Sequence, residues 1–353
     1  MKVGILTSGG DCQALNAAMR GVAKTLFNKC PGVKIIGIED GYRGMIYGRF
    51  HEMSGEDFSG ILTKGGTILG TAREPFKHIR EIGEDGLDKV KSMEDFYRRN
   101  KLDCLVVLGG NGSIKTASLL SSRGLNVVVL PKTIDNDIFG TDMTFGFMSA
   151  VDVAVNAIDC IHTTAASHSR VFIVEVMGHK TGHLALNAGI AGGADIILLP
   201  EIPYKIEKII AKIEEREKAG HHFTIVVAAE GAVSMDDLRL SKKQLKLRRE
   251  KMPVSFELAA QIRLMSGKDV RVTIPGHTQR GGSPDAYDRI LSSRLGAAAA
   301  GFIIEKKFGV LAALTGSKIT PVPLEEVAGK LKNVDVLSDE VMEAKALGIC
   351  FGD

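Results

Sequence analysis

Eight short runs rich in β-branched and aliphatic residues recur along the chain, and many of them are followed by a glycine-bearing turn and then by a helical pattern. The runs cover residues 2–7, 34–38, 105–108, 126–130, 171–176, 196–199, 224–228 and 270–274. Continuous apolar runs of this length are typical of strands that are buried on both faces. The pattern therefore predicts parallel sheets with helices on both sides.

Between these runs, apolar residues follow the i, i+3, i+4, i+7 spacing of amphipathic helices. One set is Leu15, Ala18, Met19, Val22 and Leu26, and a second is Ile206, Ile209, Ile210 and Ile213. Strands that alternate with helices predict an α/β fold with right-handed crossovers. The 353 residues suit two domains, and one strand–helix series ends near residue 146 where another begins. We therefore expect two doubly wound, Rossmann-like domains with largely parallel sheets.

Two other segments have helical signals. Ser283 and Pro284 are a favoured N-cap and first helical residue, and Gly309 is a typical stop, so a long helix is expected between them. Residues 242–251 carry six cations in ten positions. We interpret this stretch as a solvated helix face, with an anion or partner site as the alternative.

Charge, hydropathy and cysteines exclude several classes of protein. Lys and Arg number 45 against 42 Asp and Glu, a balance that does not indicate a nucleic-acid partner. No uncharged apolar stretch reaches about 18 residues, and the N-terminal run is too short for a signal peptide, so no membrane partner is expected. Five cysteines without CxxC spacing indicate reduced thiols in a cytoplasmic protein. Cys12 precedes an expected helix near Ala14, and is either an oxidation-sensitive thiol of lowered pKa or a plain packed one.

Two glycine-rich segments lie where a strand is expected to end and a helix to begin. They are residues 7–11 (TSGGD), and residues 108–113 (LGGNGS) before a helix over 114–122. Backbone N–H groups in such loops can approach a phosphate closely, and a helix N-terminus favours negative charge. Because open α/β sheets bind ligands at their carboxyl edge, the pair predicts one polyphosphate site. The alternative is that both segments are structural tight turns. Neither has the Walker spacing or the GxGxxG spacing of known nucleotide-binding loops.

Residues 131–137 (PKTIDND) follow another expected strand. Asp135 and Asp137 lie two residues apart, so one carboxylate can accept a hydroxyl proton while the other orients it or holds a metal ion. Lys132 can neutralise charge on a phosphoryl group in transfer. This pattern favours phosphoryl transfer, with an Asx-turn as the structural alternative.

Four basic residues of the second half complete the set of candidates: Arg170, Arg271, His277 and Arg280. Arginine forks match phosphate oxygens with two hydrogen bonds each. Each residue alone is typical of a surface salt bridge, but as a group beside glycines they favour a phosphorylated substrate.

Taken in order, these segments resemble the 6-phosphofructokinase family. Further matches are Gly9-Gly10-Asp11 with Asn16-Ala17-Ala18, Gly65-Gly66-Thr67 with residues 69–73 (LGTAR), residues 175–178 (EVMG) and residues 276–284 (GHTQRGGSP). The resemblance extends over about residues 1–300. It implies a phosphotransferase that moves the terminal phosphoryl group of a donor to the 1-hydroxyl of fructose 6-phosphate, with Mg²⁺ as cofactor.

The resemblance also implies roles for single residues. Asp135 is expected to be the general base, and Arg73, Lys132 and the Gly10 N–H to stabilise the transferring group. Donor contacts are expected from Gly10, Tyr42, Arg73, Gly110, Asn111, Gly112 and Ser113. Contacts to fructose 6-phosphate are expected from Thr133, Asp135, Asp137, Arg170, Met177, Gly178, His179, Glu230, Arg271, His277 and Arg280. The metal ion is expected at Asn111 and Asp137, although the family commonly has an acidic residue at the first of these.

By the same resemblance, residues 1–146 with about 279–328 bind the donor, and residues 147–278 with about 329–353 bind fructose 6-phosphate. Arg170 and Arg271 match arginines that reach the 6-phosphate from a neighbouring subunit. The resemblance therefore implies a homodimer or homotetramer.

Two positions give opposite indications about the donor. In this family, a glycine at the position of Gly112 leaves space for the α-phosphate of ATP, and an aspartate there is typical of pyrophosphate enzymes. Lys132 stands where simple bacterial ATP enzymes have glycine and pyrophosphate enzymes have lysine. We interpret the chain as ATP-dependent, because space for the α-phosphate is required and an extra cation only helps. A pyrophosphate-dependent enzyme is the alternative, and a non-catalytic sensor of nucleotide or sugar phosphate a more distant one.

Overall fold

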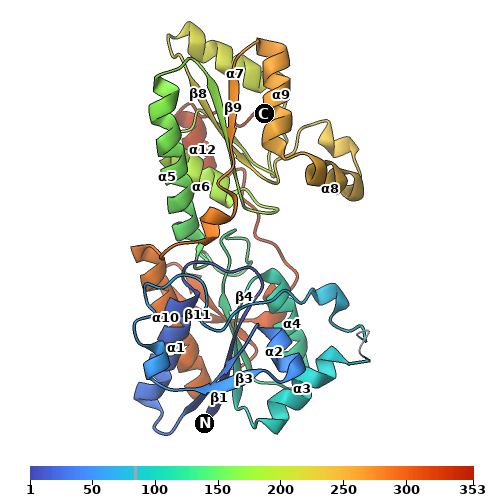
Figure 1. Ribbon diagram of the computed structural model, residues 1–353, viewed down its shortest axis with the longest axis vertical. Coiled ribbons are helices and arrows are strands. Elements are labelled where there is room, and N and C mark those ends of the chain that lie inside the picture. Colours follow the sequence, from blue (N-terminus) through green and yellow to red (C-terminus); the bar gives the residue numbers. More distant parts are fainter. Residues whose placement is uncertain (83–85) are drawn as a thin grey trace. The chain divides into compact units, whose positions relative to one another are not determined.

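The computed structural model describes residues 1–82 and 86–353, and the chain divides into two compact units (Figure 1). Unit 1 consists of Met1–Ser149 and Arg280–Lys332, and unit 2 of Ala150–Gln279 and Asn333–Asp353. Each unit is therefore built from two separate stretches of chain, the second of which comes late in the sequence.

Unit 1 contains a seven-stranded sheet in the order β11-β10-β5-β4-β1-β2-β3. Its strands are β1 (Lys2–Ser8), β2 (Lys34–Ile38), β3 (Phe50–Met53), β4 (Cys104–Gly109), β5 (Val127–Pro131), β10 (Val310–Thr315) and β11 (Lys318–Pro323). The five inner strands are parallel, and the edge strands β3 and β11 are antiparallel to their neighbours. The carboxyl ends of β1, β4 and β5 consequently lie side by side.

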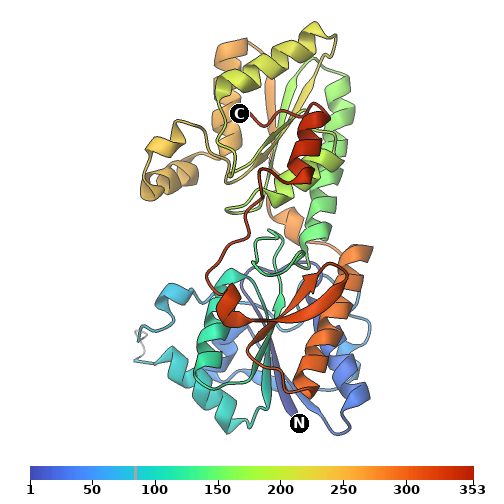
Figure 2. The same ribbon diagram turned by 180° about the vertical axis from the view of Figure 1, so that it is seen from behind.

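Helices cover both faces of this sheet (Figure 2). They are α1 (Leu15–Lys29), α2 (Tyr42–Tyr47), α3 (Lys89–Arg99), α4 (Asn111–Ser122), α10 (Ala286–Ile304) and α11 (Leu324–Val327), with 3₁₀ turns at Glu56–Phe58 and Phe76–His78. Apolar side chains of α2, α3, α4 and α11 form one buried core with the sheet. On the other face α1 and α10 approach closely, because a Cβ at Gly296 would meet the Ala18 carbonyl oxygen at 2.5 Å.

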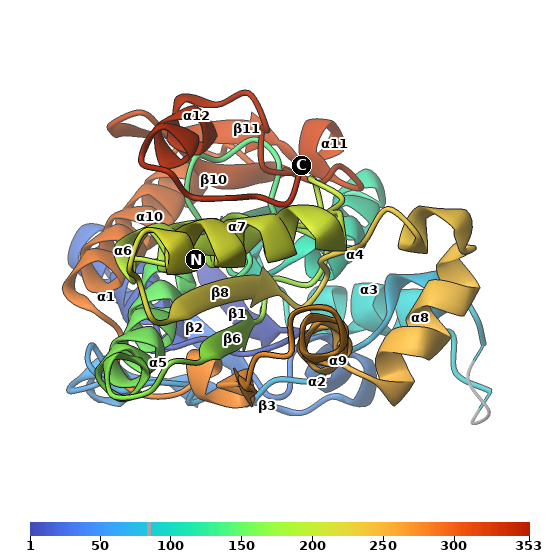
Figure 3. The same ribbon diagram turned by 90° about the horizontal axis from the view of Figure 1, so that it is seen from above.

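Unit 2 contains a parallel four-stranded sheet in the order β7-β8-β6-β9. Its strands are β6 (Val171–Val176), β7 (Ile196–Leu198), β8 (Thr224–Ala229) and β9 (Val270–Thr273). The helices are α5 (Phe147–Ala166), which begins in unit 1, α6 (His183–Ala191), α7 (Ile206–Lys218), α8 (Lys242–Lys251), α9 (Val254–Ser266) and α12 (Asp339–Ala346), with 3₁₀ turns at Asp237–Arg239 and Gly276–Arg280. Side chains of α7 and α9 pack on one face of the sheet, and α5 and α6 lie on the other (Figure 3).

The structure confirms all eight predicted strands and both amphipathic helices, α1 and α7. The structure also confirms the long helix, α10, but both of its ends lie inside the expected positions. α10 begins at Ala286, because Asp285 caps it by accepting the Asp288 N–H at 2.7 Å, whereas the Ser283 hydroxyl donates to the Thr63 carbonyl. The helix ends at Ile304, where Lys306 takes a φ of +55°. Gly309 instead lies just before β10.

Within the described residues, no helix is both long and apolar enough to cross a lipid bilayer.

Candidate active site

Two glycine-rich loops of unit 1 lie next to each other at the carboxyl edge of the sheet. They follow β1 and β4, neighbouring parallel strands in which Ser8 pairs with Gly109. The Ser113 hydroxyl at the start of α4 donates to the Ser8 hydroxyl at 2.9 Å and joins the two loops. The fold thus brings together the two segments whose backbone N–H groups are suited to a polyphosphate.

The first loop has a backbone that only small residues fit. Gly9 has a φ of +87°, and a Cβ at Gly10 would meet Nη1 of Arg280 at 2.7 Å. Nη1 of Arg280 donates to the Asp11 carbonyl at 2.9 Å, which fixes this guanidinium group against the loop. Arg73 is exposed, and the carbonyl of the residue before it, Ala72, accepts the Gly9 N–H at 3.2 Å. The first loop therefore contacts the side chain of Arg280 and the backbone next to Arg73.

The second loop leads directly into α4, whose N-cap is Gly110. A Cβ built at Gly112 meets nothing within 4 Å, so this part of the loop faces open space. The buried Tyr42 hydroxyl donates to the Ser113 carbonyl at 2.8 Å and braces the first turn of α4. Burial raises the pKa of Tyr42, which keeps its hydroxyl a neutral donor.

Lys132 connects the third segment to the first loop. It follows β5, whose last residue, Pro131, pairs with Gly109. The side chain is 3% exposed, and Nζ donates to the Gly10 carbonyl. Burial lowers the pKa of Lys132 to about 8, and the positive charge of Arg280 adds to this lowering. A cation is thus held under the first cradle at neutral pH.

The two candidate carboxylates follow Lys132. The Asp135 N–H donates to the Thr133 hydroxyl at 3.1 Å, and the Asn111 amide nitrogen donates to Oδ2 of Asp137 at 2.8 Å. Asn111 begins α4, so the third segment is tied directly to the second loop. Three segments far apart in sequence therefore meet at one edge of one sheet.

A cavity of about 390 Å³ lies along the outer face of α4 in the same unit. It is lined by Phe76, Arg80, Lys115, Ser118, Leu119, Ser122, Ala328 and Gly329. The α4 residues of this lining follow Asn111 at helical spacing, so the cavity continues the helix face that begins at the second loop. Its mixture of aromatic, aliphatic and cationic groups suits a flat, polar ring system next to phosphates.

In unit 2, another set of candidates meets at the carboxyl ends of β6 and β8. The His179 N–H donates to Oε1 of Glu230 at 2.8 Å. Gly178 has a φ of +138°, and a Cβ at Gly231 would meet the His179 carbonyl oxygen at 2.4 Å. The Met177 N–H donates to the side chain of Gln279, in the 3₁₀ turn that carries the exposed His277. Glycine at 178 and 231 thus permits the two loops to pack closely.

Arg170 and Arg271 meet at one carboxylate of unit 2. Oδ2 of Asp269 accepts from Nε of Arg170 at 2.6 Å and from Nη2 of Arg271 at 3.1 Å. Two guanidinium groups that share one carboxylate leave a net positive charge, which suits a phosphate. Arg280, which sequence reasoning grouped with these residues, belongs to unit 1.

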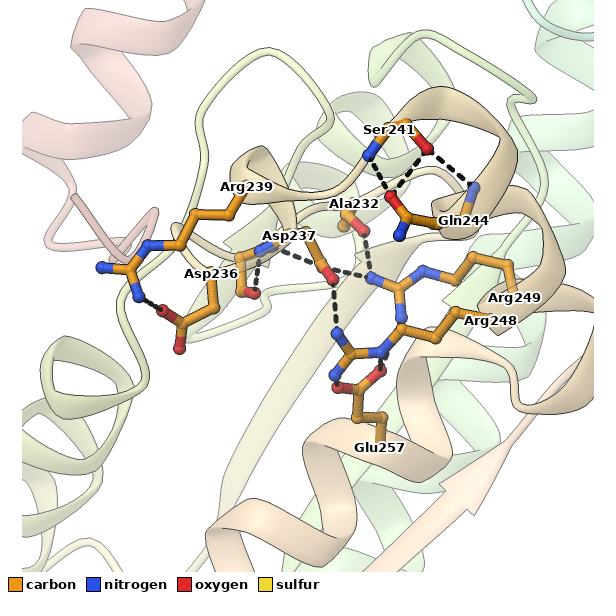
Figure 4. A network of polar contacts seen from close by, with 10 residues as sticks. Ala232, Asp236, Asp237, Arg239, Ser241, Gln244, Arg248, Arg249 and Glu257 are labelled. Carbon is orange, nitrogen blue, oxygen red and sulfur yellow. Dashed lines mark hydrogen bonds and ion pairs between the residues drawn. The ribbon is translucent and has the colours of Figure 1, made fainter.

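The cationic segment 242–251 forms α8, in which no residue is buried, as a solvated face requires. Two of its arginines are nevertheless engaged in a polar network (Figure 4). Arg249 donates to Asp237 at 2.6 Å, to Glu257 at 2.7 Å and to the Ala232 carbonyl at 3.1 Å. Arg248 pairs with the same two carboxylates. Since Ala232 follows Glu230 by two residues, the network also fastens the loop that carries this candidate.

We expect Arg249→Met to destabilise the protein by about 3 kcal/mol, because it leaves two largely buried carboxylates with one fewer cation. Asp237 is 1% exposed and Glu257 13%. Arg239→Met is the matched control: its pair with Asp236 is 84% and 79% exposed, so a loss below about 1 kcal/mol is expected. Urea unfolding of both variants checks this, and equal losses would contradict it.

Cys12 is a packed thiol and not a reactive one. It is fully buried, and burial raises its pKa to about 12. The oxidation-sensitive hypothesis is therefore wrong, because desolvation of a thiolate outweighs the favourable helix N-terminus. All five cysteines are free, as predicted.

Sequence reasoning missed two groups that lie against the candidate site. One is the cavity lining at Phe76 and Arg80, because the sequence after Arg73 departs from that of the family it resembles and left the contacts there unassigned. The other is Lys332, whose Nζ donates to Oδ1 of Asn136 at 2.9 Å, between the two candidate carboxylates. The apolar run 310–314 before it signals a strand, but nothing local indicates where this lysine lies.

Comparison with known proteins adds an independent line of evidence. A family model described as phosphofructokinase matches residues 2–303. The chain is 52% identical to the ATP-dependent 6-phosphofructokinase of Spirochaeta thermophila, over 99% of this chain and 97% of that protein. It is 45% identical to the ATP-dependent 6-phosphofructokinase of Propionibacterium freudenreichii over the whole of both chains.

Solved structures are similar as well. The phosphofructokinase of Pichia pastoris has a TM-score of 0.81 and 34% identity, over 93% of this chain and 37% of that one. The pyrophosphate-dependent phosphofructokinase of Marinobacter aquaeolei has a TM-score of 0.80 and 23% identity, over 96% and 87% of the two chains. The second likeness shows the fold alone. Together with the sheets described above, these neighbours confirm the predicted α/β, Rossmann-like fold.

Proposed function

Because the chain belongs to the phosphofructokinase family, we propose that it is an ATP-dependent 6-phosphofructokinase, which acts in glycolysis in the cytoplasm. The observation that carries this proposal is the meeting of three loops at one edge of the unit 1 sheet. They bring two backbone cradles and the buried cation of Lys132 to one place, in a segment that continues to Asp135.

In the proposed reaction, the Asp135 carboxylate takes the proton of the sugar 1-hydroxyl as its oxygen attacks the γ-phosphorus of ATP in line. The bond from that phosphorus to the bridging oxygen breaks, and its electrons leave with ADP. Lys132, Arg73 and the Gly10 N–H stabilise the charge that develops on the phosphoryl oxygens and the leaving group. Thr133 holds the backbone of Asp135 through its hydroxyl.

The residues present fit a Mg²⁺ ion. Among the described residues no group of three or more His, Cys, Asp or Glu could hold a metal by itself. Mg²⁺ needs only one or two protein oxygens, because it keeps water and substrate phosphates as its other ligands. Asp137 and the amide of Asn111, in contact at the donor loop, are the proposed ligands. The ion, when bound, neutralises charge on the donor phosphates.

ATP is the proposed donor for two reasons of shape. The space at Gly112 gives an α-phosphate room next to the second cradle. The cavity along α4 then offers the adenine ring a place between Phe76, Arg80 and Lys115. Pyrophosphate would use neither feature.

Unit 2 is the proposed site for fructose 6-phosphate. Met177, Gly178, His179, Glu230 and His277 are proposed contacts to the sugar. Arg170 and Arg271 are proposed to bind the 6-phosphate of the fructose 6-phosphate that is held by a neighbouring subunit. A homodimer or homotetramer is therefore the proposed active form. Thr133, Asp135, Asp137 and Arg280, the other residues expected to contact fructose 6-phosphate, belong to unit 1.

Side-by-side assays of the purified protein test this function. With fructose 6-phosphate and Mg²⁺, we expect fructose 1,6-bisphosphate to form with ATP at least about 10²-fold faster than with pyrophosphate. Pyrophosphate lacks the contacts that the α-phosphate and adenine of ATP would make, and their loss costs several kcal/mol of transition-state stabilisation. Faster turnover with pyrophosphate would show that pyrophosphate, and not ATP, is the phosphoryl donor. No turnover with either donor would overturn the kinase itself and favour a non-catalytic sensor.

A further inference from the structure

The backbone between the two candidate carboxylates has an unusual conformation. Asn136 stands between Asp135 and Asp137 with a φ of +51°. Residues other than glycine adopt this region rarely, and they hold it where surrounding contacts enforce it. The directions of both carboxylates therefore depend on whatever fixes Asn136.

Two groups fix the Asn136 side chain, which is buried. Its Oδ1 accepts the Thr144 N–H at 3.1 Å and the Lys332 ammonium group at 2.9 Å. The Thr144 hydroxyl also donates to the Thr133 carbonyl at 2.9 Å, which closes the other end of the segment. Of these groups, Lys332 alone comes from a distant part of the chain.

Lys332 makes more contacts to the same loop. Nζ also donates to the carbonyls of Thr141 at 3.0 Å and Asp142 at 2.9 Å, so each of the three ammonium protons has an acceptor. The Lys332 N–H donates to the Asp137 carbonyl at 3.0 Å. One residue thus holds residues 136, 137, 141 and 142 at fixed distances from one another.

We propose that Lys332 is a positioning residue for phosphoryl transfer, which holds the backbone between Asp135 and Asp137 so that both carboxylates face the reacting groups. The inference rests on the proposed function of these two aspartates. Lys332 itself does not touch the substrates in this scheme. A neutral side chain of similar length would fill its place but remove the ammonium donor from the Thr141 and Asp142 carbonyls, and would leave Oδ1 of Asn136 with the Thr144 N–H alone.

The test compares Lys332→Met with Lys330→Met. Lys330 is two residues away in the same segment, but it is exposed, with Nζ 5.0 Å from the centre of the Phe139 ring. Because misplacement of a catalytic group by about 1 Å costs on the order of 10²-fold, we expect kcat to fall about 10–100-fold in Lys332→Met. The KM values for ATP and fructose 6-phosphate should stay within about twofold, and Lys330→Met should match the wild type.

Two further variants separate positioning from stability. Asn136→Gly keeps the positive φ at no steric cost but removes the amide that Lys332 holds. It should also lower kcat, and the double variant Asn136→Gly/Lys332→Met should lose less than the sum of the two effects. This arm remains informative if Lys332→Met fails to fold. Lys332→Arg, which keeps the charge and the donors, should restore part of kcat.

An unchanged kcat in either single variant would overturn the inference, as would additive losses in the double variant. A fall that comes with an equal rise in both KM values would also overturn it, because it would indicate general loosening of the unit. These results are distinct from failure of the proposed function, in which the wild type itself has no activity with either donor.

Discussion

An Asp135→Asn variant is expected to lose about 10²–10⁴-fold in kcat, the range typical for removal of a general base. Asparagine has nearly the same shape, and the Asp135 N–H can still donate to the Thr133 hydroxyl at 3.1 Å, so the backbone should keep its place. The amide cannot accept the proton of the sugar hydroxyl. KM for fructose 6-phosphate is therefore expected to change little while turnover collapses.

Steady-state kinetics with ATP and fructose 6-phosphate check this expectation, with Asp236→Asn as the control. Asp236 is a 79% exposed aspartate of unit 2, and its loss should leave kcat unchanged. Retained turnover in Asp135→Asn would remove this residue from its proposed role. Asp137 would then be the next base to test, since it lies in the same segment.

The second large effect is expected from Gly112→Asp. A carboxylate at this position would lie beside the proposed α-phosphate, and two like charges about 4 Å apart repel by about 4 kcal/mol at an effective dielectric constant of 20. We expect kcat/KM for ATP to fall on the order of 10³-fold. Fructose 6-phosphate binding should be unaffected, because the change is confined to the donor loop.

Gly112→Ala separates charge from size. A Cβ at this position meets nothing within 4 Å, and Gly112 does not have a positive φ, so alanine should fold normally and keep most of its ATP activity. Aspartate in the first turn of α4 should also fold, because helix N-termini favour negative charge. Normal use of ATP by Gly112→Asp would show that the α-phosphate does not pass this residue.

Most strands that are buried on both faces were predictable from sequence, although the buried inner strand β10 was not among the predicted runs. β4 and β5 consist almost entirely of aliphatic residues, because helices cover them on both sides. β11 was missed because it contains Pro321 and Pro323 and is only half buried, as an edge strand tolerates. β3 was missed because it is short and mostly exposed. A pattern of apolar residues reveals a strand only where the strand is buried, and the edge strands β3 and β11 are mostly exposed or half buried.

Parts of the candidate site were predictable for a different reason. Glycines at strand ends and closely spaced aspartates leave a local signature, and the sheet order then places them together. The contacts of Lys332 and Arg249 leave none. Lys332 meets Asn136 across 196 residues, and Arg249 meets Asp237 through a turn that the sequence pattern does not specify. Such contacts depend on the packed fold, and a single sequence does not encode them in any spacing.

The two-part construction of each unit has a consequence for synthesis. The ribosome synthesises residues 1–149 well before Arg280–Lys332. The later stretch supplies α10, β10 and Lys332, which holds the segment around Asp135. Likewise, β7 lacks one of its hydrogen-bond partners until Cys350 has been synthesised, because the Cys350 carbonyl accepts the Ile197 N–H at 2.9 Å. Neither unit can be completed before its late stretch has been synthesised, so the nascent chain exposes unfinished sheet edges until then.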